Sequence, residues 1–189
     1  MDFIISKANK LLGFIYRSTK AFSNIRCLIV LYVSIVRSVA EYCSVVWSPS
    51  YSTRISRIEK IQSKFIKALC LKCGIEYSST NYDHLLHYFS LPRLESRRKY
   101  CDIVFIFKVV NSFIKCPDIS NLLQFYIPSN HSLRNNPLLQ IEYHRTNYGM
   151  HSPIVRMSRA VNDVHSQVDV LSGSLIRFKR DLKRLLYRS

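Results

Sequence analysis

The 189-residue chain carries 28 Lys and Arg residues against 12 Asp and Glu residues, which gives a net charge of +16 at pH 7. Because 48% of the residues are apolar and 21% are charged, the composition favours a packed core and argues against wholesale disorder. Such an excess of one charge repels itself in a compact chain, so we expect a polyanionic partner. The sequence contains no lipidation motif, and we therefore favour nucleic acid over an anionic membrane surface.

The N-terminal sequence indicates a protein that stays inside the cell. Met-Asp-Phe-Ile-Ile-Ser-Lys places an acid where a signal peptide has basic residues, and its apolar run is too short for one. We therefore expect the six cysteines to be reduced thiols in a nuclear or cytoplasmic protein that is not secreted.

One stretch, Ile25 to Pro49, has the densest apolar content and holds the only tryptophan, Trp47. We interpret it as the central, nearly enclosed helix of a helical bundle. Other helices, each with one apolar face, would pack around it. A membrane-spanning helix needs about 20 consecutive apolar residues, and Arg26 and Arg37 interrupt this run far too early. The chain has only four glycines, which also favours a mainly α fold.

Apolar residues at helical spacing predict further helices along the chain. Residues 1–116 are expected to form a thumb-like helical bundle, and residues 117–189 a basic C-terminal extension with an irregular loop region at 128–153. A strand is the alternative for the short apolar run 103–110, and Pro117 is expected to end the helix that contains this run. The predicted helices are Phe3–Phe22, Arg54–Leu71 with Thr53 as its cap, Tyr82–Phe89, Ser90–Val110 with Pro92 in its first turn, Ile119–Phe125, Ile154–Val164 and Ser174–Tyr187.

Several of these helices gather cations on one side. On the helix at 54–71, Arg57, Lys60, Lys64 and Lys67 share an arc of about 80°, and Glu59 is the one acid of that helix. A solvated face is the alternative interpretation, but the shortage of acids favours contacts with phosphates. The residues predicted to bind nucleic acid are Lys7, Lys10, Arg17, Lys20, Arg57, Lys60, Lys64, Lys67, Arg97, Arg98, Arg177, Lys179, Arg180, Lys183 and Arg184.

No pattern in the sequence predicts catalysis, a metal centre or a cofactor. Cys70, Cys73, His84 and His87 are residue types that bind zinc, but their spacing is wrong. Ten residues separate the two pairs and two separate the histidines, where a classical finger has about twelve and three to five. We interpret them as ordinary core or surface residues. Nucleophile elbows and glycine-rich phosphate loops are absent from the sequence.

One series of short motifs runs through nearly the whole chain in a fixed order. The motifs are Ala8-Asn9-x-Leu11-Leu12-Gly13-Phe14-Ile15, Leu31-Tyr32-x-Ser34-x-Val36-Arg37-Ser38-x-x-Glu41-Tyr42-x-Ser44-x-Val46-Trp47-Ser48-Pro49, Ile58-Glu59-x-Ile61-Gln62-x-Lys64-Phe65, Leu91-Pro92-x-Leu94-Glu95-x-Arg97-Arg98, Phe105-x-Phe107-Lys108, Arg145-Thr146-Asn147-Tyr148-Gly149, Ser152-Pro153 and Arg156-x-x-Arg159-x-x-Asn162. In this order they resemble the region that follows the catalytic palm in reverse transcriptases of jockey-type non-LTR retrotransposons.

The resemblance implies a polyprotein with an endonuclease, fingers and a palm, followed by a helical thumb and a C-terminal extension; this chain is similar only to the last two. No position matches the family's Ala-Asp-Asp motif, its other metal-binding aspartate or its endonuclease residues. The resemblance therefore implies no enzyme activity for this chain alone, and no site for the Mg²⁺ that the palm uses. It implies a fragment of an RNA-directed DNA polymerase that holds the backbone of an RNA/DNA template–primer duplex without sequence preference.

Three alternatives stay open at this point. In the first, the chain is a non-functional relic of a truncated mobile element, and its exposed apolar side chains favour aggregation. In the second, the chain works together with a palm domain supplied by another chain. In the third, it is a membrane-surface or protein-interaction module that uses its basic amphipathic terminal helix.

Overall fold

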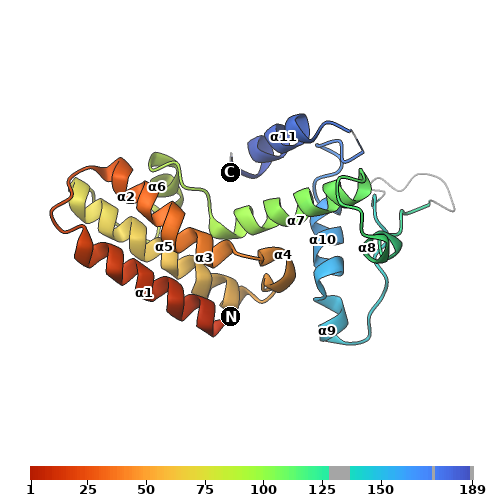
Figure 1. Ribbon diagram of the computed structural model, residues 1–189, viewed down its shortest axis with the longest axis horizontal. Helices are drawn as coiled ribbons and strands as arrows, with labels where there is room; N and C mark the ends of the chain where they lie inside the picture. The colour runs from red at the N-terminus through yellow and green to blue at the C-terminus, as the bar shows by residue number, and fades with distance from the viewer. Residues whose placement is uncertain (128–136, 172, 188–189) are drawn as a thin grey trace. The chain divides into compact units, whose positions relative to one another are not determined.

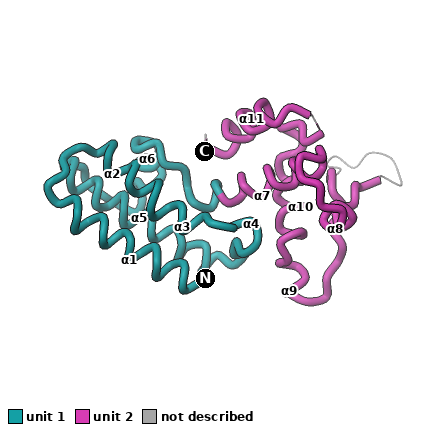
Figure 2. The backbone as a smooth tube through the Cα atoms, viewed as in Figure 1, with its two compact units in different colours: residues 1–97 teal, residues 98–189 magenta. Residues whose placement is uncertain are grey.

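The computed structural model describes residues 1–127, 137–171 and 173–187. Within these ranges the chain is mainly helical and contains no β-strand, which confirms the all-α class (Figure 1). The chain forms two compact units, residues 1–97 and 98–189 (Figure 2). The division falls inside helix α7 (Leu94–Val110), whereas the sequence interpretation placed a boundary after residue 116.

The first unit is built on two long helices, α1 and α5, which Figure 1 shows side by side with the stretch from α2 to α3. Their buried faces form one core, in which the ring of Tyr32 stacks on the ring of Phe65 with 4.1 Å between centroids. The elements of this unit are α1 (Asp2–Ser18), α2 (Ile25–Leu31), the π-helical η1 (Tyr32–Arg37), α3 (Ser38–Glu41), α4 (Ser44–Trp47), α5 (Ser52–Cys73) and α6 (Tyr82–Tyr88).

The interpretation of Ile25–Pro49 as one enclosed central helix was wrong in two respects. The backbone leaves the helix after α3, because Cys43 has a left-handed conformation with φ of 52° that costs free energy for a residue with a side chain. The helical part is also not enclosed, since Val30 is 62% exposed. Only one face is buried, through side chains spaced by four residues: Leu28, Tyr32, Val36 and Ala40.

Helix α5 contributes more to this core, with seven buried residues. Its cap is Tyr51, so the predicted cap, Thr53, lies within the first turn. It ends at Gly74, whose φ of 67° is the left-handed conformation that glycine adopts without steric cost at a helix C-terminus.

The second unit packs its helices around the apolar half of α7. The ring of Phe107 stacks on that of Phe178 in α11 with 3.9 Å between centroids, and Ile103 and Ile106 are fully buried. The run 103–110 is therefore helical, and the strand alternative is excluded. The other elements are α8 (Pro117–Asn121), α9 (Asn147–Met150), α10 (Pro153–Asn162) and α11 (Leu175–Tyr187).

Several predicted helix ends differ from the structure. Pro92 precedes α7, and α7 ends at Val110 just before Ser112 turns the backbone with φ of 60°. Pro117 begins α8 instead of ending α7, in agreement with its fixed φ at a first helical position. The helix predicted at 119–125 stops at residue 121. In the predicted loop 128–153, residues 128–136 lie outside the described residues, 137–146 are not helical, and α9 follows.

Candidate nucleic-acid interface

Four of the exposed basic side chains of α5 lie on one side of the helix: Arg57, Lys60, Lys64 and Lys67. We call them the α5 cation row. Their spacing of three and four residues confines them to about 80° of the helix surface and spreads them over about 15 Å of its length. The row lies opposite the buried face of α5, so its charges point away from the core of the first unit.

A surface hollow of about 240 Å³ lies between this row and α1. Arg57, Lys60, Ile61 and Lys64 line it from α5, and Ile5 and Asn9 line it from α1. The Nζ of Lys64 donates to Oδ1 of Asn9 at 2.9 Å, and Arg57 pairs with the exposed Asp2 at 2.6 Å. Lys60 and Lys67 make no hydrogen bond or ion pair with any described residue, so both ammonium groups are available to an anion.

Helix α1 runs parallel to α5, and Lys72 holds its C-terminal end. The Nζ of Lys72 donates to the carbonyl oxygens of Thr19 at 3.1 Å, Lys20 at 3.3 Å and Phe22 at 2.8 Å. A cation at this position satisfies carbonyls that the helix leaves without partners, and it complements the negative end of the helix dipole. Tyr16 adds a hydrogen bond from its hydroxyl to the carbonyl oxygen of Lys64 at 2.9 Å.

The predicted cations of α1 are exposed but do not all accompany the α5 row. Asn9 faces α5, and Lys7 lies about 160° around the helix from it, while Lys10 and Arg17 lie within about 100°. Lys20 follows the end of α1. Only Lys10 and Arg17 are therefore placed to extend the basic surface from α5 across α1.

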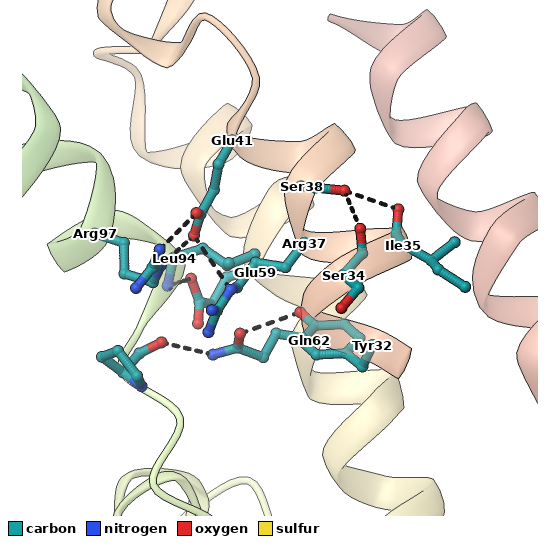
Figure 3. A network of polar contacts seen from close by, with 11 residues as sticks. Tyr32, Ser34, Ile35, Arg37, Ser38, Glu41, Glu59, Gln62, Leu94 and Arg97 are labelled. Carbon is teal, nitrogen blue, oxygen red and sulfur yellow. Dashed lines mark hydrogen bonds and ion pairs between the residues drawn. The ribbon is translucent and has the colours of Figure 1, made fainter. Parts of the chain in front are cut away.

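Arg97 is paired inside the first unit and does not belong to the exposed basic surface (Figure 3). Its Nη2 donates to Oε2 of Glu41 at 2.8 Å and its Nε donates to the other oxygen of that carboxylate. The Nε of Arg37 lies 3.9 Å from the same carboxylate. Because Glu41 offsets both guanidinium groups, we leave Arg97 out of the candidate interface.

Glu59, the acid of α5, points away from the cation row. Its Oε1 accepts a hydrogen bond from the hydroxyl of Tyr82 at 2.8 Å. Its Oε2 accepts one from the backbone N–H of Leu94 at 3.1 Å, as Figure 3 shows. Leu94 is the first residue of α7, so the carboxylate takes the place of a capping side chain. The only acid on α5 is thereby engaged elsewhere and does not neutralise the row.

Gln62 connects this network to the core. Its Oε1 accepts a hydrogen bond from the hydroxyl of Tyr32 at 3.1 Å, and its Nε2 donates to the carbonyl oxygen of Pro92 at 3.0 Å. Burial raises the pKa of both Tyr32 and Tyr82 well above the usual tyrosine range, and the negative charge of Glu59 raises both further. Both hydroxyls therefore remain protonated donors.

Several residues of the short sequence motifs belong to this network. Arg37, Glu41, Glu59, Gln62 and Arg97 each occupy a motif position and each contact another helix or helix end within the first unit. Their arrangement assigns these positions a role in joining α3, α5 and the start of α7.

Arg98 lies in the core of the second unit. It is 2% exposed, and the nearby Asp102 is 3% exposed. Asp102 accepts a hydrogen bond from Nε of Arg156 at 2.9 Å. Burial raises the pKa of Asp102, and the positive charges of Arg156 and Arg98 oppose that rise. Arg98 thus contributes to a buried charged cluster and presents no cation at the surface.

The predicted cations of α11 surround one acid. Phe178 and Leu182 are buried, which confirms the amphipathic pattern of this helix. Asp181 lies 3.3 Å from Arg180 and 3.9 Å from both Arg177 and Arg184. Lys179 is half-buried and Lys183 is exposed. The α11 cations are therefore partly offset by Asp181, whereas in the α5 row the one ion pair with a described residue is that of Arg57 with Asp2.

The described part of the chain holds no group of three or more His, Cys, Asp or Glu side chains that could bind a metal ion. Cys70 is fully buried, and burial raises the pKa of its thiol, whereas Cys73 is exposed. They and the histidines His84 and His87 form no such group. Among the described helices, none is long and apolar enough to cross a membrane.

Comparison of the chain with protein families, curated proteins and solved structures finds no match.

Two residues that shape this surface were not predicted from the sequence. Asn9 lines the hollow and contacts Lys64, and Lys72 fixes α1 beside the row. A signal for Asn9 was present, because it lies four residues after Ile5 on the side of α1 that faces α5. No comparable local signal marks Lys72, whose partners are 50 to 53 residues away.

Proposed function

We propose that the chain binds the sugar–phosphate backbone of a nucleic acid duplex through the α5 cation row. The observation that carries this proposal is the row itself: Arg57, Lys60, Lys64 and Lys67 are exposed on one side of a long helix, and the acid of that helix is engaged with Tyr82 and Leu94. Along a duplex axis, about 15 Å of helix matches about four phosphates of one strand at 3.4 Å each.

Lysine suits this kind of binding. Its ammonium group acts as a point charge that can contact a phosphate from many directions. Arginine, in contrast, recognises a base edge through two parallel hydrogen bonds from its planar guanidinium group. Contacts to phosphate position a protein on the duplex but carry no sequence information. The proposed binding is therefore insensitive to sequence.

The ordered motifs support a more specific form of the proposal, in which the chain corresponds to the thumb and C-terminal extension of an RNA-directed DNA polymerase. In that form the bound nucleic acid is an RNA/DNA template–primer duplex, and a palm domain supplied by another chain would be a partner. The chain alone then holds the duplex without polymerising DNA.

Fluorescence polarisation with a labelled RNA/DNA duplex at low salt tests the binding proposal. A triple variant, Lys60→Glu, Lys64→Glu and Lys67→Glu, is expected to lose most of the affinity. The matched control reverses three exposed cations of the second unit, Lys115, Arg145 and Arg159, and so has the same net charge. Equal loss of affinity in both variants would assign binding to net charge and reject the row as the interface. Absence of binding by a folded wild-type chain would instead favour a non-functional relic.

A further inference from the structure

A second hollow lies within the second unit and plays no part in the proposed duplex binding. Its volume is about 290 Å³, close to the lower limit of about 300 Å³ for small-molecule pockets. The end of α8, the extended residues on either side of the bridge between Phe125 and Leu139, and the first turns of α10 surround it.

The walls of this hollow are fixed by hydrogen bonds. Oδ1 of Asn162, the last residue of α10, accepts from the backbone N–H groups of Leu138 at 3.0 Å and Leu139 at 2.9 Å, and its Nδ2 donates to the carbonyl oxygen of Leu139 at 2.8 Å. The backbone N–H of Gln140 donates to the carbonyl oxygen of Gln124 at 2.8 Å. One side chain of α10 thus holds the extended wall in place.

His144 lines the hollow from the segment before α9. A Cβ atom added to Gly149 would lie 2.8 Å from Cβ of His144, so only glycine allows the histidine to approach α9 this closely. This packing restricts the position of the imidazole at the hollow.

The N-terminus of α10 opens into the same hollow through Ser152, Ile154 and Val155. The N-cap Ser152 makes no side-chain capping hydrogen bond, and Pro153 has no N–H to satisfy. The backbone N–H groups of Ile154 and Val155 have no carbonyl four residues earlier in the helix. This ten-residue helix therefore presents two donors and the positive end of its dipole to an anion.

Ser158 provides a second, independent observation that points to a ligand. It lies one turn after Ile154, lines the hollow, and is only 5% exposed. Its hydroxyl makes no hydrogen bond with any described residue. The residue is buried but its hydroxyl oxygen is not fully enclosed, so the hydroxyl is left as a donor for a ligand in the hollow that Ser158 lines.

The remaining lining identifies the ligand class. Leu122 and Ile141 offer apolar surface, and Gln124 and Gln140 offer amide groups of the kind that pair with base edges. Glu142, which accepts a hydrogen bond from Nε2 of Gln124 at 3.3 Å, repels a phosphate but accepts from a base amino group. We propose that this hollow binds a nucleoside monophosphate, with its phosphate at the first turn of α10 and its base against the amide and apolar side chains.

Adenosine monophosphate is the probe for this site, titrated into the whole chain and followed by calorimetry and by NMR of the Ile154 and Val155 amides. It is expected to bind more tightly than adenosine or inorganic phosphate alone, and to shift both amides. Equal binding of inorganic phosphate, or no shift of these amides, would overturn the proposal. A 5′-phosphorylated dinucleotide that binds equally well would identify a strand end as the natural source; one that fails to bind would identify the free nucleotide.

Three variants separate a binding role from a structural one. Ser152→Asp keeps a good N-cap but places a carboxylate beside the phosphate, so affinity should fall about tenfold or more. Ser158→Ala should weaken binding severalfold without lowering the melting temperature, because the hydroxyl has no partner in the protein. Ser166→Ala, at an exposed position outside the hollow, is the control and should change neither quantity. Unaltered affinity in both Ser152→Asp and Ser158→Ala would contradict the site, whatever the outcome for duplex binding.

Discussion

The carboxylate of Glu59 accepts a hydrogen bond from the backbone N–H of Leu94 at 3.1 Å, so a side chain of α5 caps the first turn of α7. This contact has two consequences. It joins segments 35 residues apart, and it turns the one acid of α5 away from the row formed by Arg57, Lys60, Lys64 and Lys67. The stability of the first unit and its basic surface thus depend on the same side chain.

Replacement of Glu59 by Ala is expected to destabilise the first unit by about 1–3 kcal/mol, because it leaves the Leu94 N–H and the Tyr82 hydroxyl without their acceptor. Trp47 is the only tryptophan of the chain and lies in this unit, so its fluorescence during urea unfolding measures the effect. Glu95→Ala, at an exposed position in the first turn of α7, is the control and should cost about 1 kcal/mol at most. Equal losses in the two variants would contradict the capping role of Glu59.

Replacement of Lys72 by Met should destabilise the first unit by about 1 kcal/mol, because three carbonyl oxygens at the end of α1 lose their donor. It should leave duplex affinity nearly unchanged. Lys67→Met on the same helix should do the reverse, with weaker duplex binding and little change in the urea midpoint. If both variants affected the same property, the division between a structural lysine and a binding lysine would fail.

The first unit should lose stability as the pH rises above about 10. Burial raises the pKa of Tyr16, Tyr32 and Tyr82, so each keeps its proton in the folded state while the unfolded chain releases it. The contribution of each tyrosine to the free energy of unfolding is fully present at a pH below the pKa of tyrosine in the unfolded chain. Above that pKa the contribution falls by about 1.4 kcal/mol per pH unit for each tyrosine.

Urea midpoints measured through Trp47 fluorescence between neutral and alkaline pH test this expectation. Tyr82→Phe should make the alkaline loss of stability less steep, even though it lowers stability at neutral pH by removing the hydrogen bond to Glu59. Tyr42→Phe is the matched control, because Tyr42 is 76% exposed. An alkaline slope that is the same in Tyr82→Phe as in the wild type would contradict the assignment.

Much of the helical fold could be predicted from the sequence, because amphipathic periodicity is strong in α1, α5, α10 and α11. The interruption at Cys43 could not, since a left-handed backbone at a residue other than glycine has no local sequence signal. The exposure of Val30 also escaped prediction. An apolar run shows that burial is possible, but which of its faces are covered depends on helices elsewhere in the chain.

The α5 row could be predicted for a similar reason: its residues are close in sequence and their periodicity fixes their side of the helix. The sequence could not distinguish Arg97 and Arg98 from the exposed cations of the row, because the residues that surround these two arginines are distant in sequence. Glu41 is 56 residues from Arg97, and only the tertiary fold brings the two together. Charge and periodicity identify cations, but not which of them the fold neutralises.

The salt dependence of duplex binding tests the central claim most directly. Each phosphate contact contributes about 0.9 to the slope of log affinity against log salt concentration. If the row binds phosphates, the neutral variant Lys60→Gln, Lys64→Gln and Lys67→Gln should show a slope shallower by about 3 than the wild type, with its urea midpoint unchanged. A variant that binds more weakly but keeps the wild-type slope would contradict phosphate contact by these lysines.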